Sequence, residues 1–212
     1  MTQRLNDLAV SDLVARLATS DPVPGGGSAS ALAGAMAAAL VEMVVALTVG
    51  RPAAADHEAR LAEIGSAAAE LRAQLLRLAE VDADAYAAVV AARRMPKDSD
   101  AERSARQERI TISVRDATRA PLQVVLRSAD ALALAESLAP IGNRNAASDV
   151  GVAGLLAAAA MRGAAMNVEI NLPSLPDDDG LRREARAALD SQLAGLGSRE
   201  RALASAVGDR IG

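Results

Sequence analysis

Residues 22–50 read PVPGGGSASALAGAMAAALVEMVVALTVG and set the architecture of the chain. The run of Pro and Gly at 21–27 breaks any helix that reaches it from the N-terminal side. Beyond Ser28, a plausible N-cap, the segment is apolar on every side except at Glu42. A helix that is apolar all round belongs in a protein interior, so the segment predicts a central, buried helix from Ala29 to Thr48.

The same kind of composition continues on both sides of this helix. Alanine, leucine, arginine and glutamate favour helix, and β-branched alternation is nearly absent. The spacing of apolar residues and the breaks at Pro and Gly predict further helices over Leu5–Ala18, Ala55–Arg94, Ser99–Arg119, Leu122–Leu138, Ala146–Glu169 and Asp177–Ile211, with a boundary or kink at Pro121. The Gly- and Ala-rich helix from Ala146 is the second buried one. The sequence therefore predicts an all-α, single-domain bundle of long Ala-rich helices over residues 1–212, with two buried central helices.

The composition of the 212 residues excludes several classes of protein. The absence of cysteine excludes disulfide scaffolds and Cys-ligated metal sites. The net charge is -4 and Tyr86 is the only aromatic residue, whereas nucleic-acid binders usually combine a basic face with stacking aromatics. We therefore expect no nucleic-acid partner. The single histidine, His57, argues against a Ser-His-Asp triad or a multi-histidine metal site.

An alanine-rich core also predicts an oligomer. Each alanine buries about one methyl group, at ~0.8 kcal/mol per CH₂. Such helices often finish burying their apolar faces against a second subunit, so we expect a homo-oligomer and most simply a dimer. The helix at 29–48 is long enough to cross a membrane, but it carries Glu42 and lacks an aromatic belt, so we expect no membrane span. No basic and then apolar leader opens the sequence, which predicts a cytoplasmic protein.

The first candidate functional group consists of Gly25, Gly26, Gly27 and Ser28, ahead of the first buried helix. Free backbone N–H groups and the helix dipole at such a junction can bind an anion, and glycine lets a ligand approach the backbone. No Gly-Lys-Ser/Thr follows, so the run is not a Walker A loop. A flexible turn with a helix cap explains the same residues, and the spacing alone favours that simpler interpretation.

The second candidate group is formed by Asp82 and Tyr86. They are four residues apart and share a helix face, whereas Asp84 points away from them. Asp82 continues an apolar stripe, where a carboxylate is either a satisfied buried acid or a catalytic acid with a raised pKa. Tyr86 is suited either to stacking on a flat heterocycle or to packing in the core. The sequence leaves both choices open.

The third candidate group is a set of six polar residues that flank or lie on the second buried helix: Asn143, Arg144, Asn145, Asp149, Asn167 and Asn171. The first four surround the start of the helix, either as caps and a dipole partner or as the polar mouth of a site. The last two are four residues apart on one face, where paired carboxamides can read the donor and acceptor edges of a ligand.

Taken together, these segments resemble the cyclodeaminase domain of formiminotransferase-cyclodeaminase and the related methenyltetrahydrofolate cyclohydrolases. The resemblance runs in order over nearly the whole chain, through the segment quoted above, VDADAYAAVVAARRMPKD at 81–98, ATRAPL at 117–122 and GNRNAASDVGVAGLLAAAAMRGAAMNVEINL at 142–172. It departs at Gly50-Arg51-Pro52, where the family often has a Lys-rich run, and at Tyr86, where the family commonly has Phe. Because Gly50-Arg51-Pro52 contains no lysine, the first departure argues against a lysine-dependent binding of a polyglutamate tail at this position.

The resemblance implies an oligomeric, all-α enzyme that acts on a reduced folate, with or without a polyglutamate tail. Cyclodeaminases of the family convert 5-formiminotetrahydrofolate to 5,10-methenyltetrahydrofolate and ammonia. Cyclohydrolases of the family add water to the methenyl compound and give 10-formyltetrahydrofolate. The segments NVEINL and LTVG favour the cyclodeaminase. A catalytically silent helical oligomer that binds folate or a partner protein is the alternative outside catalysis.

The same resemblance implies a mechanism in which folate supplies its own electrophile, so that no metal or cofactor beyond the tetrahydrofolate substrate is required. We expect Asp82 and Asp149 to divide two tasks, general acid/base catalysis and stabilisation of the cationic methenyl group. The side chains that would orient the pterin are Asn143, Asn145, Asn167 and Asn171, and Tyr86 would bind the substrate by stacking on its flat ring system. The helix start at Gly25, Gly26, Gly27 and Ser28, together with Arg144, would take the glutamyl carboxylate.

Overall fold

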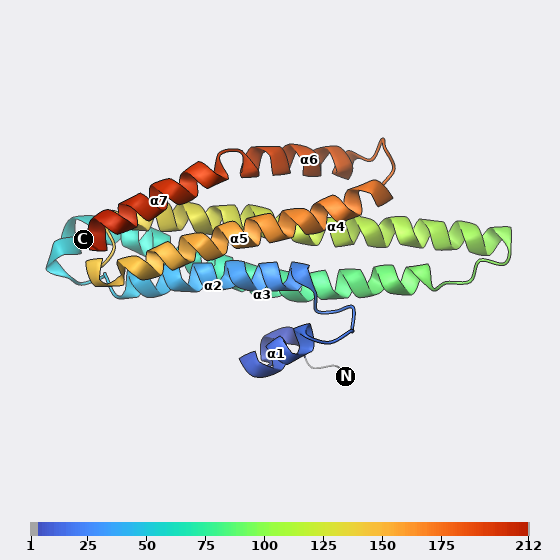
Figure 1. Ribbon diagram of the computed structural model, residues 1–212, viewed down its shortest axis with the longest axis horizontal. Helices are drawn as coiled ribbons and strands as arrows, with labels where there is room; N and C mark the ends of the chain where they lie inside the picture. The colour runs from blue at the N-terminus through green and yellow to red at the C-terminus, as the bar shows by residue number, and fades with distance from the viewer. Residues whose placement is uncertain (1–3, 212) are drawn as a thin grey trace.

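The computed structural model describes residues 4–211, and over that range its regular structure is helical (Figure 1). The α-helices are α1 (Val10–Leu17), α2 (Gly26–Ala46), α3 (Glu58–Arg93), α4 (Asp100–Leu138), α5 (Ala147–Asn171), α6 (Gly180–Leu193) and α7 (Leu196–Ile211). Short 3-10 helices occupy Leu5–Asp7, Pro52–His57, Arg144–Ala146 and Leu172–Ser174. The all-α prediction is confirmed.

Helices α2, α3, α4 and α5 form the bundle. Helix α2 packs on α3 and α5, and α4 packs on the same two helices, so the four close around a common interior. Helices α3 and α4 extend beyond the others to a tip, α7 lies along α5, and α1 stands apart below α2 (Figure 1). The N-terminal end of α2 and the C-terminal end of α5 therefore meet at one level of the bundle, where α3 and α4 pass by.

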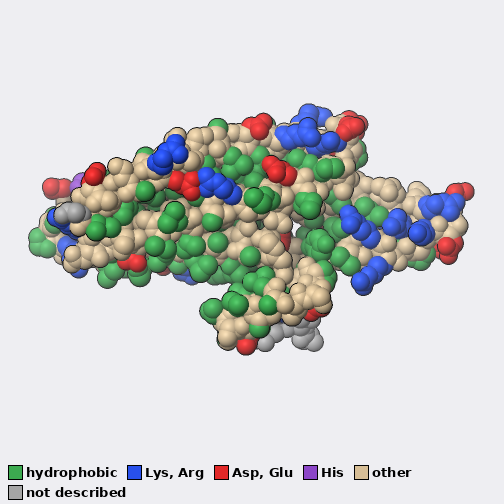
Figure 2. Space-filling model, in the orientation of Figure 1, with side chains coloured by type: hydrophobic (Ala, Val, Ile, Leu, Met, Phe, Trp, Pro, Cys, Tyr) green, Lys and Arg blue, Asp and Glu red, His purple; other side chains and the backbone are tan. Residues whose placement is uncertain are grey.

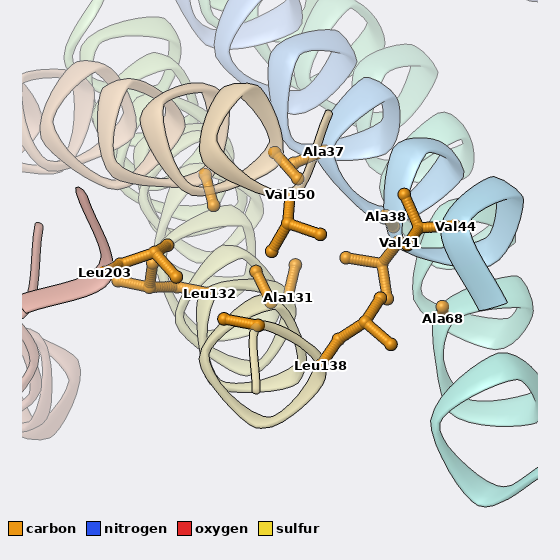
Figure 3. Close-up of a cluster of buried hydrophobic side chains, with 14 of the residues drawn as sticks. Ala37, Ala38, Val41, Val44, Ala68, Ala131, Leu132, Leu138, Val150 and Leu203 are labelled. Carbon is orange, nitrogen blue, oxygen red and sulfur yellow. The ribbon is translucent and has the colours of Figure 1, made fainter. Parts of the chain in front are cut away.

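Small residues let the helices approach closely. Val41 of α2 points toward Leu138 of α4, and Ala37 of α2 lies beside Val150 of α5, with no aromatic ring in this part of the core (Figure 3). A Cβ atom built on Gly154 of α5 would overlap the end of the Leu203 side chain on α7, so the glycine lets Leu203 pack directly on the backbone of α5. Each alanine buries little area, and the close packing recovers stability through many dispersion contacts.

Several helix boundaries differ from the prediction. Helix α2 begins at Gly26, three residues early, so Gly25 and not Ser28 is its N-cap. Pro121 lies inside one continuous helix, α4, where a boundary or kink was expected. The last predicted helix is divided into α6 and α7, because Gly195, with a φ of 70°, turns the chain between them.

The two central helices are only half covered. Of the apolar window in each, 44% is buried for Gly26–Ala46 and 50% for Arg144–Ser174. By length and composition alone both could cross a membrane, yet their covered sides build the interior of the bundle, as core helices of soluble proteins do. Their central position is confirmed, but the expectation of full burial is wrong. Each keeps one apolar stripe open to solvent.

Candidate functional site

A cavity of about 210 Å³ opens where the first turn of α2 meets α3, α4 and α5. Four segments that are far apart in the sequence line it, and we call it the acidic cavity. The lining residues are Pro22, Val23, Gly25, Gly26, Gly27, Asp82, Tyr86, Ala117, Asn167, Ile170 and Asn171. The fold thus brings together most of the first two candidate groups and the Asn pair of the third. Their spacing in the sequence did not show that they would be neighbours.

Asp82 of α3 packs directly against the first turn of α2. The Ser28 hydroxyl lies 3.0 Å from Oδ2 of Asp82 and 3.0 Å from the carbonyl oxygen of Ala79, so it can donate to either. A Cβ atom built on Gly27 would overlap the Asp82 carboxylate. The glycine run therefore permits close approach of a helix to a carboxylate, which is a stricter requirement than a flexible turn.

The electrostatics of Asp82 favour a proton-transfer role. Burial raises the pKa of its carboxyl above the ordinary value, and the hydrogen bonds from the side chain and backbone of Ser28 lower it only in part. Asp82 is also the one charged side chain among the described residues that line the acidic cavity. A carboxyl with a raised pKa in a cavity is a candidate general acid or base, because its proton affinity moves toward the working pH.

The Asn pair offers oxygen acceptors to the acidic cavity. Nδ2 of Asn167 donates to the carbonyl oxygen of Gly163 at 2.8 Å, and Nδ2 of Asn171 donates to the carbonyl oxygens of Ala117 and Asn167 at 2.9 and 3.0 Å. Among the described residues neither Oδ1 has a partner. The cavity thus presents two amide oxygens and a carboxylate, a set that suits a ligand edge rich in N–H donors.

Pro121 explains why Asn171 is held there. Proline lacks an N–H, so the carbonyl oxygen of Ala117, four residues earlier in α4, loses its helical donor. Nδ2 of Asn171 supplies that missing donor across the helix interface. The proline that was expected to mark a boundary instead frees a backbone acceptor that positions a side chain of the candidate site.

Tyr86 stands at the mouth of the acidic cavity, on the same helix face as Asp82, and is 44% exposed. Ile170, which is 75% exposed, also lines the cavity. The volume of 210 Å³ lies below the ~300–1,000 Å³ typical of pockets that enclose a drug-sized ligand. Within one chain the cavity can therefore enclose only part of such a ligand, next to an exposed ring.

The rest of the third group lies elsewhere. Asn143, Arg144, Asn145 and Asp149 are at the opposite end of α2 and α5, and eighteen residues of α5 separate Asp149 from Asn167, about 27 Å at ~1.5 Å per residue. The expectation that Asp82 and Asp149 act in one site, and that these four residues join the Asn pair, is therefore wrong within a single chain. Because one helix carries both Asp149 and Asn167, its length keeps them apart, and their spacing in the sequence already implied this.

That opposite end has a cavity of its own, of about 400 Å³, which we call the arginine cavity. It is lined by Thr48, Arg51, Ala53, Ala54, His57, Pro140, Ile141, Gly142, Asn143, Arg144, Asn145 and Arg210. The Thr48 hydroxyl accepts from the N–H of Asn143 at 2.9 Å, and Nδ2 of Asn143 donates to the carbonyl oxygen of Leu47 at 3.2 Å. Asn143 is thus a structural clamp between the end of α2 and the start of α5.

Residues 9–191 match the model of a protein family described as formiminotransferase-cyclodeaminase. The chain belongs to this family. The match spans α2 to α5 and so includes every residue that lines the acidic cavity. The resemblance found in the sequence is confirmed, and the chain is an enzyme of the cyclodeaminase and cyclohydrolase type.

Individual relatives agree with the family assignment. Methenyltetrahydrofolate cyclohydrolase of Methylorubrum extorquens AM1 is 40% identical over 182 residues, which cover 86% of this chain and 87% of that protein. Formimidoyltransferase-cyclodeaminase of Rattus norvegicus is 31% identical over 176 residues, which cover 83% of this chain but only 32% of the rat protein. The crystal structure of formiminotetrahydrofolate cyclodeaminase from Thermotoga maritima superposes with a TM-score of 0.86 at 28% identity, over 98% of this chain and 100% of that one.

Several residues of the two cavities were missed in the sequence. Ala117 stood in a family-like segment but has no reactive group, and its contribution is the carbonyl oxygen that Pro121 frees. Arg51, His57 and Arg210 come together only through the fold, since Arg210 arrives from the last helix. A proline inside a strongly helical pattern was the one available sign of the Ala117 site.

Proposed function

We propose that this member of the family is a methenyltetrahydrofolate cyclohydrolase, which adds water to 5,10-methenyltetrahydrofolate and gives 10-formyltetrahydrofolate. The observation that carries the choice of reaction is the 40% identity to the Methylorubrum cyclohydrolase along 87% of that protein. The rat cyclodeaminase relative is 31% identical, over 32% of its length. This proposal reverses the preference for cyclodeamination that NVEINL and LTVG suggested.

Asp82 is the general base in this proposal. The methenyl carbon between N5 and N10 is electrophilic and carries positive charge, which the carboxylate stabilises. As a water oxygen attacks that carbon, the carboxylate takes one water proton and a neutral tetrahedral adduct forms. The C–N5 bond then breaks, Asp82 returns its proton to N5, and the hydroxyl proton leaves to solvent as the formyl group forms on N10. The sum is one water consumed and one proton released, with no cofactor beyond the folate.

The remaining cavity residues orient the pterin. Its amino group and ring N–H groups are donors, and the free Oδ1 atoms of Asn167 and Asn171 are acceptors of the matching kind. Tyr86, at the mouth, stacks on the ring system. Gly27 and Ser28 keep the Asp82 carboxylate in place against the start of α2.

Cyclodeamination is the second candidate. The Thermotoga cyclodeaminase matches this chain over its full length, and a carboxyl with a raised pKa is also suited to protonating departing ammonia. The two reactions differ in the leaving group and share the methenyl compound.

The deciding experiment follows the absorbance band of methenyltetrahydrofolate with purified protein. Accelerated loss of the band from added methenyl compound, above the uncatalysed rate, supports the cyclohydrolase. Growth of the band from 5-formiminotetrahydrofolate, with ammonia released in equal amount, would establish the cyclodeaminase and overturn the proposal. If the protein converts neither substrate, but added tetrahydrofolate quenches the fluorescence of Tyr86, the chain is a catalytically silent folate-binding protein and the proposal fails.

A further inference from the structure

The Ser28 hydroxyl is buried between two acceptors. Ser28 is fully shielded from solvent, at 0% exposure, in the first turn of α2. Its Oγ lies 3.0 Å from the carbonyl oxygen of Ala79 and 3.0 Å from Oδ2 of Asp82, and both of these residues belong to α3. A hydroxyl has a single proton to donate. Ser28 therefore donates to only one of the two oxygens at a time.

The charge on Asp82 decides which of the two acceptors is the stronger. A hydrogen bond to a carboxylate is roughly twice as strong as a hydrogen bond to a neutral carbonyl group. An ionised Asp82 therefore takes the hydroxyl proton in preference to Ala79. Once the carboxyl is protonated it loses this advantage, and its own O–H needs an acceptor, which a lone pair of Oγ can supply. The Ala79 carbonyl oxygen is then the better acceptor for the Ser28 proton.

Ala79 can gain or lose this bond at little cost. It lies inside α3, so its carbonyl oxygen already accepts the helical N–H from four residues further along the chain. The same oxygen has a second lone pair, which the Ser28 hydroxyl can use or leave. A buried hydroxyl with no acceptor at all would be costly. Two acceptors at equal distance spare Ser28 that cost in either protonation state of Asp82.

The backbone at the start of α2 supports the ionised carboxyl from a fixed position. The N-cap, Gly25, has no side chain that could accept from the first N–H groups of the helix, and the positive end of the helix dipole favours a carboxylate there. Hydrogen bonds from the hydroxyl and from the backbone of Ser28 both lower the pKa of Asp82, against the larger effect of burial. Because the backbone is held in the helix, the hydroxyl is the part of Ser28 that can follow the proton.

We propose that Ser28 is a positioning residue whose hydroxyl turns with the proton of Asp82. The hydroxyl donates to Oδ2 while the carboxyl is ionised. It turns toward the Ala79 carbonyl oxygen, and accepts from the carboxyl O–H, while the acid is protonated. The hydroxyl keeps its own proton throughout, so the proton that Asp82 takes from water and returns to N5 moves without separating α2 from α3. This inference rests on the proposed function, in which Asp82 is the base.

Among the described residues that line the acidic cavity, no second charged side chain accompanies Asp82. Helix α3 adds Tyr86 as the one other titratable group of that lining, α2 adds glycines, α4 adds Ala117, and α5 adds Ile170 and the neutral amides of the Asn pair. On the face shown in Figure 2, Lys and Arg side chains gather on the projecting part of α3 and α4 and on α6, but none stands over the start of α2. A change at Ser28 should therefore reach Asp82 directly and not through a third charge.

Titration of the Asp82 carboxyl by carbon NMR tests the hydroxyl without any catalysis. The signal of Asp82 is assigned by its absence from Asp82→Asn. Ser28→Ala removes the hydroxyl and leaves a good helix former in its place. We expect the pKa of Asp82 to rise in this variant, with about 5–10-fold tighter proton binding, because the lost hydrogen bond is stronger to the charged form. A titration midpoint equal to that of the wild type would overturn the proposal.

Ser30→Ala is the matched control. Ser30 lies two residues further along α2 and is 8% exposed, and its hydroxyl donates to the carbonyl oxygen of Gly26 at 2.7 Å. That bond stays within α2 and does not involve Asp82. The control should therefore leave the titration of Asp82 unchanged. An equal rise of the Asp82 pKa in both serine variants would show a general loosening of α2 and would contradict a specific role of Ser28.

Neutron diffraction from deuterated wild-type crystals tests the turn itself. Data are collected at one pH above and one pH below the titration midpoint of Asp82. The hydroxyl deuterium of Ser28 should point to Oδ2 at the higher pH and to the Ala79 carbonyl oxygen at the lower pH. A deuterium that points the same way at both values would overturn the turning hydroxyl.

The pH profile of kcat/KM connects the hydroxyl to the reaction. In Ser28→Ala the acid limb should move to higher pH, so that kcat/KM on that limb is about 5–10-fold below the wild type, whereas Ser30→Ala should follow the wild type. An acid limb that stays in place while the pKa of Asp82 rises would refute the link to catalysis. A wild type that is inactive on both folates would be the separate failure of the proposed function, and the carbon NMR and neutron measurements would still decide the role of Ser28.

Discussion

Replacing Gly27 by alanine tests whether the position of one carboxylate governs catalysis. The added Cβ would overlap the Asp82 carboxylate, so the carboxylate must move away from Ser28. A hydrogen bond to a charged group contributes ~1.5–3 kcal/mol, and alanine in place of glycine in a helix returns about 1 kcal/mol. We therefore expect a net loss of about 0.5–2 kcal/mol of folding free energy. A displacement of about 1 Å at a catalytic group costs on the order of 10²-fold in rate, so kcat/KM should fall by about that factor.

The assay is loss of the methenyl absorbance band, together with thermal unfolding of the same preparation. Gly208→Ala in α7 is the control, because a Cβ atom there meets nothing within 4 Å. It should keep full activity and gain up to about 1 kcal/mol of stability. A Gly27→Ala protein with wild-type kcat/KM would refute the reasoning, since the carboxylate would then not need its observed place.

Further predictions follow from the same contacts. Asp82→Asn should lower kcat by about 10²–10⁴-fold. The same substitution should raise the unfolding temperature at neutral pH, because a carboxyl whose pKa is raised in the folded state costs stability when it is ionised. Thermal unfolding measured against pH should show this gain vanish below pH 3.8, the ordinary pKa of the carboxyl. Wild-type kcat/KM should fall as the pH drops through the raised pKa of Asp82, and a pH profile without an inflection above 3.8 would remove it as the base. Asn167→Ala should raise KM about 2–10-fold by loss of one neutral hydrogen bond, with kcat less affected in steady-state kinetics. The Arg115 guanidinium, through its hydrogen bonds, holds the pKa of Asp179 below its ordinary value of 3.8, so Asp179→Asn should destabilise the protein at neutral pH. Chemical denaturation at several pH values should show the difference in unfolding free energy between wild type and variant shrink as the pH drops through that lowered pKa.

The sequence predicted which segments are helical better than which sides of those helices are buried. Apolar periodicity placed α3 and α5 within a few residues, because it reports which positions face the interior. It could not show that α2 has an open side, since alanine is equally apolar on a buried and an exposed stripe. Asp82, Tyr86 and the Asn pair do line one cavity with the glycine run, as expected. Asp149 does not, and the helical rise of ~1.5 Å per residue alone puts it about 27 Å from Asn167, a spacing that the expectation of one shared site overlooked. The homodimer and the cytoplasmic location stay predictions.

The alanine-rich composition and the incomplete cavity have one physical origin. Small side chains bring α2, α3 and α5 close enough for a helix start to touch a carboxylate, as at Gly27 and Asp82. The same small side chains leave no bulk to build the walls of a deep pocket, so only about 210 Å³ is enclosed within one chain. The same packing therefore fixes the position of Asp82 and limits the volume around it.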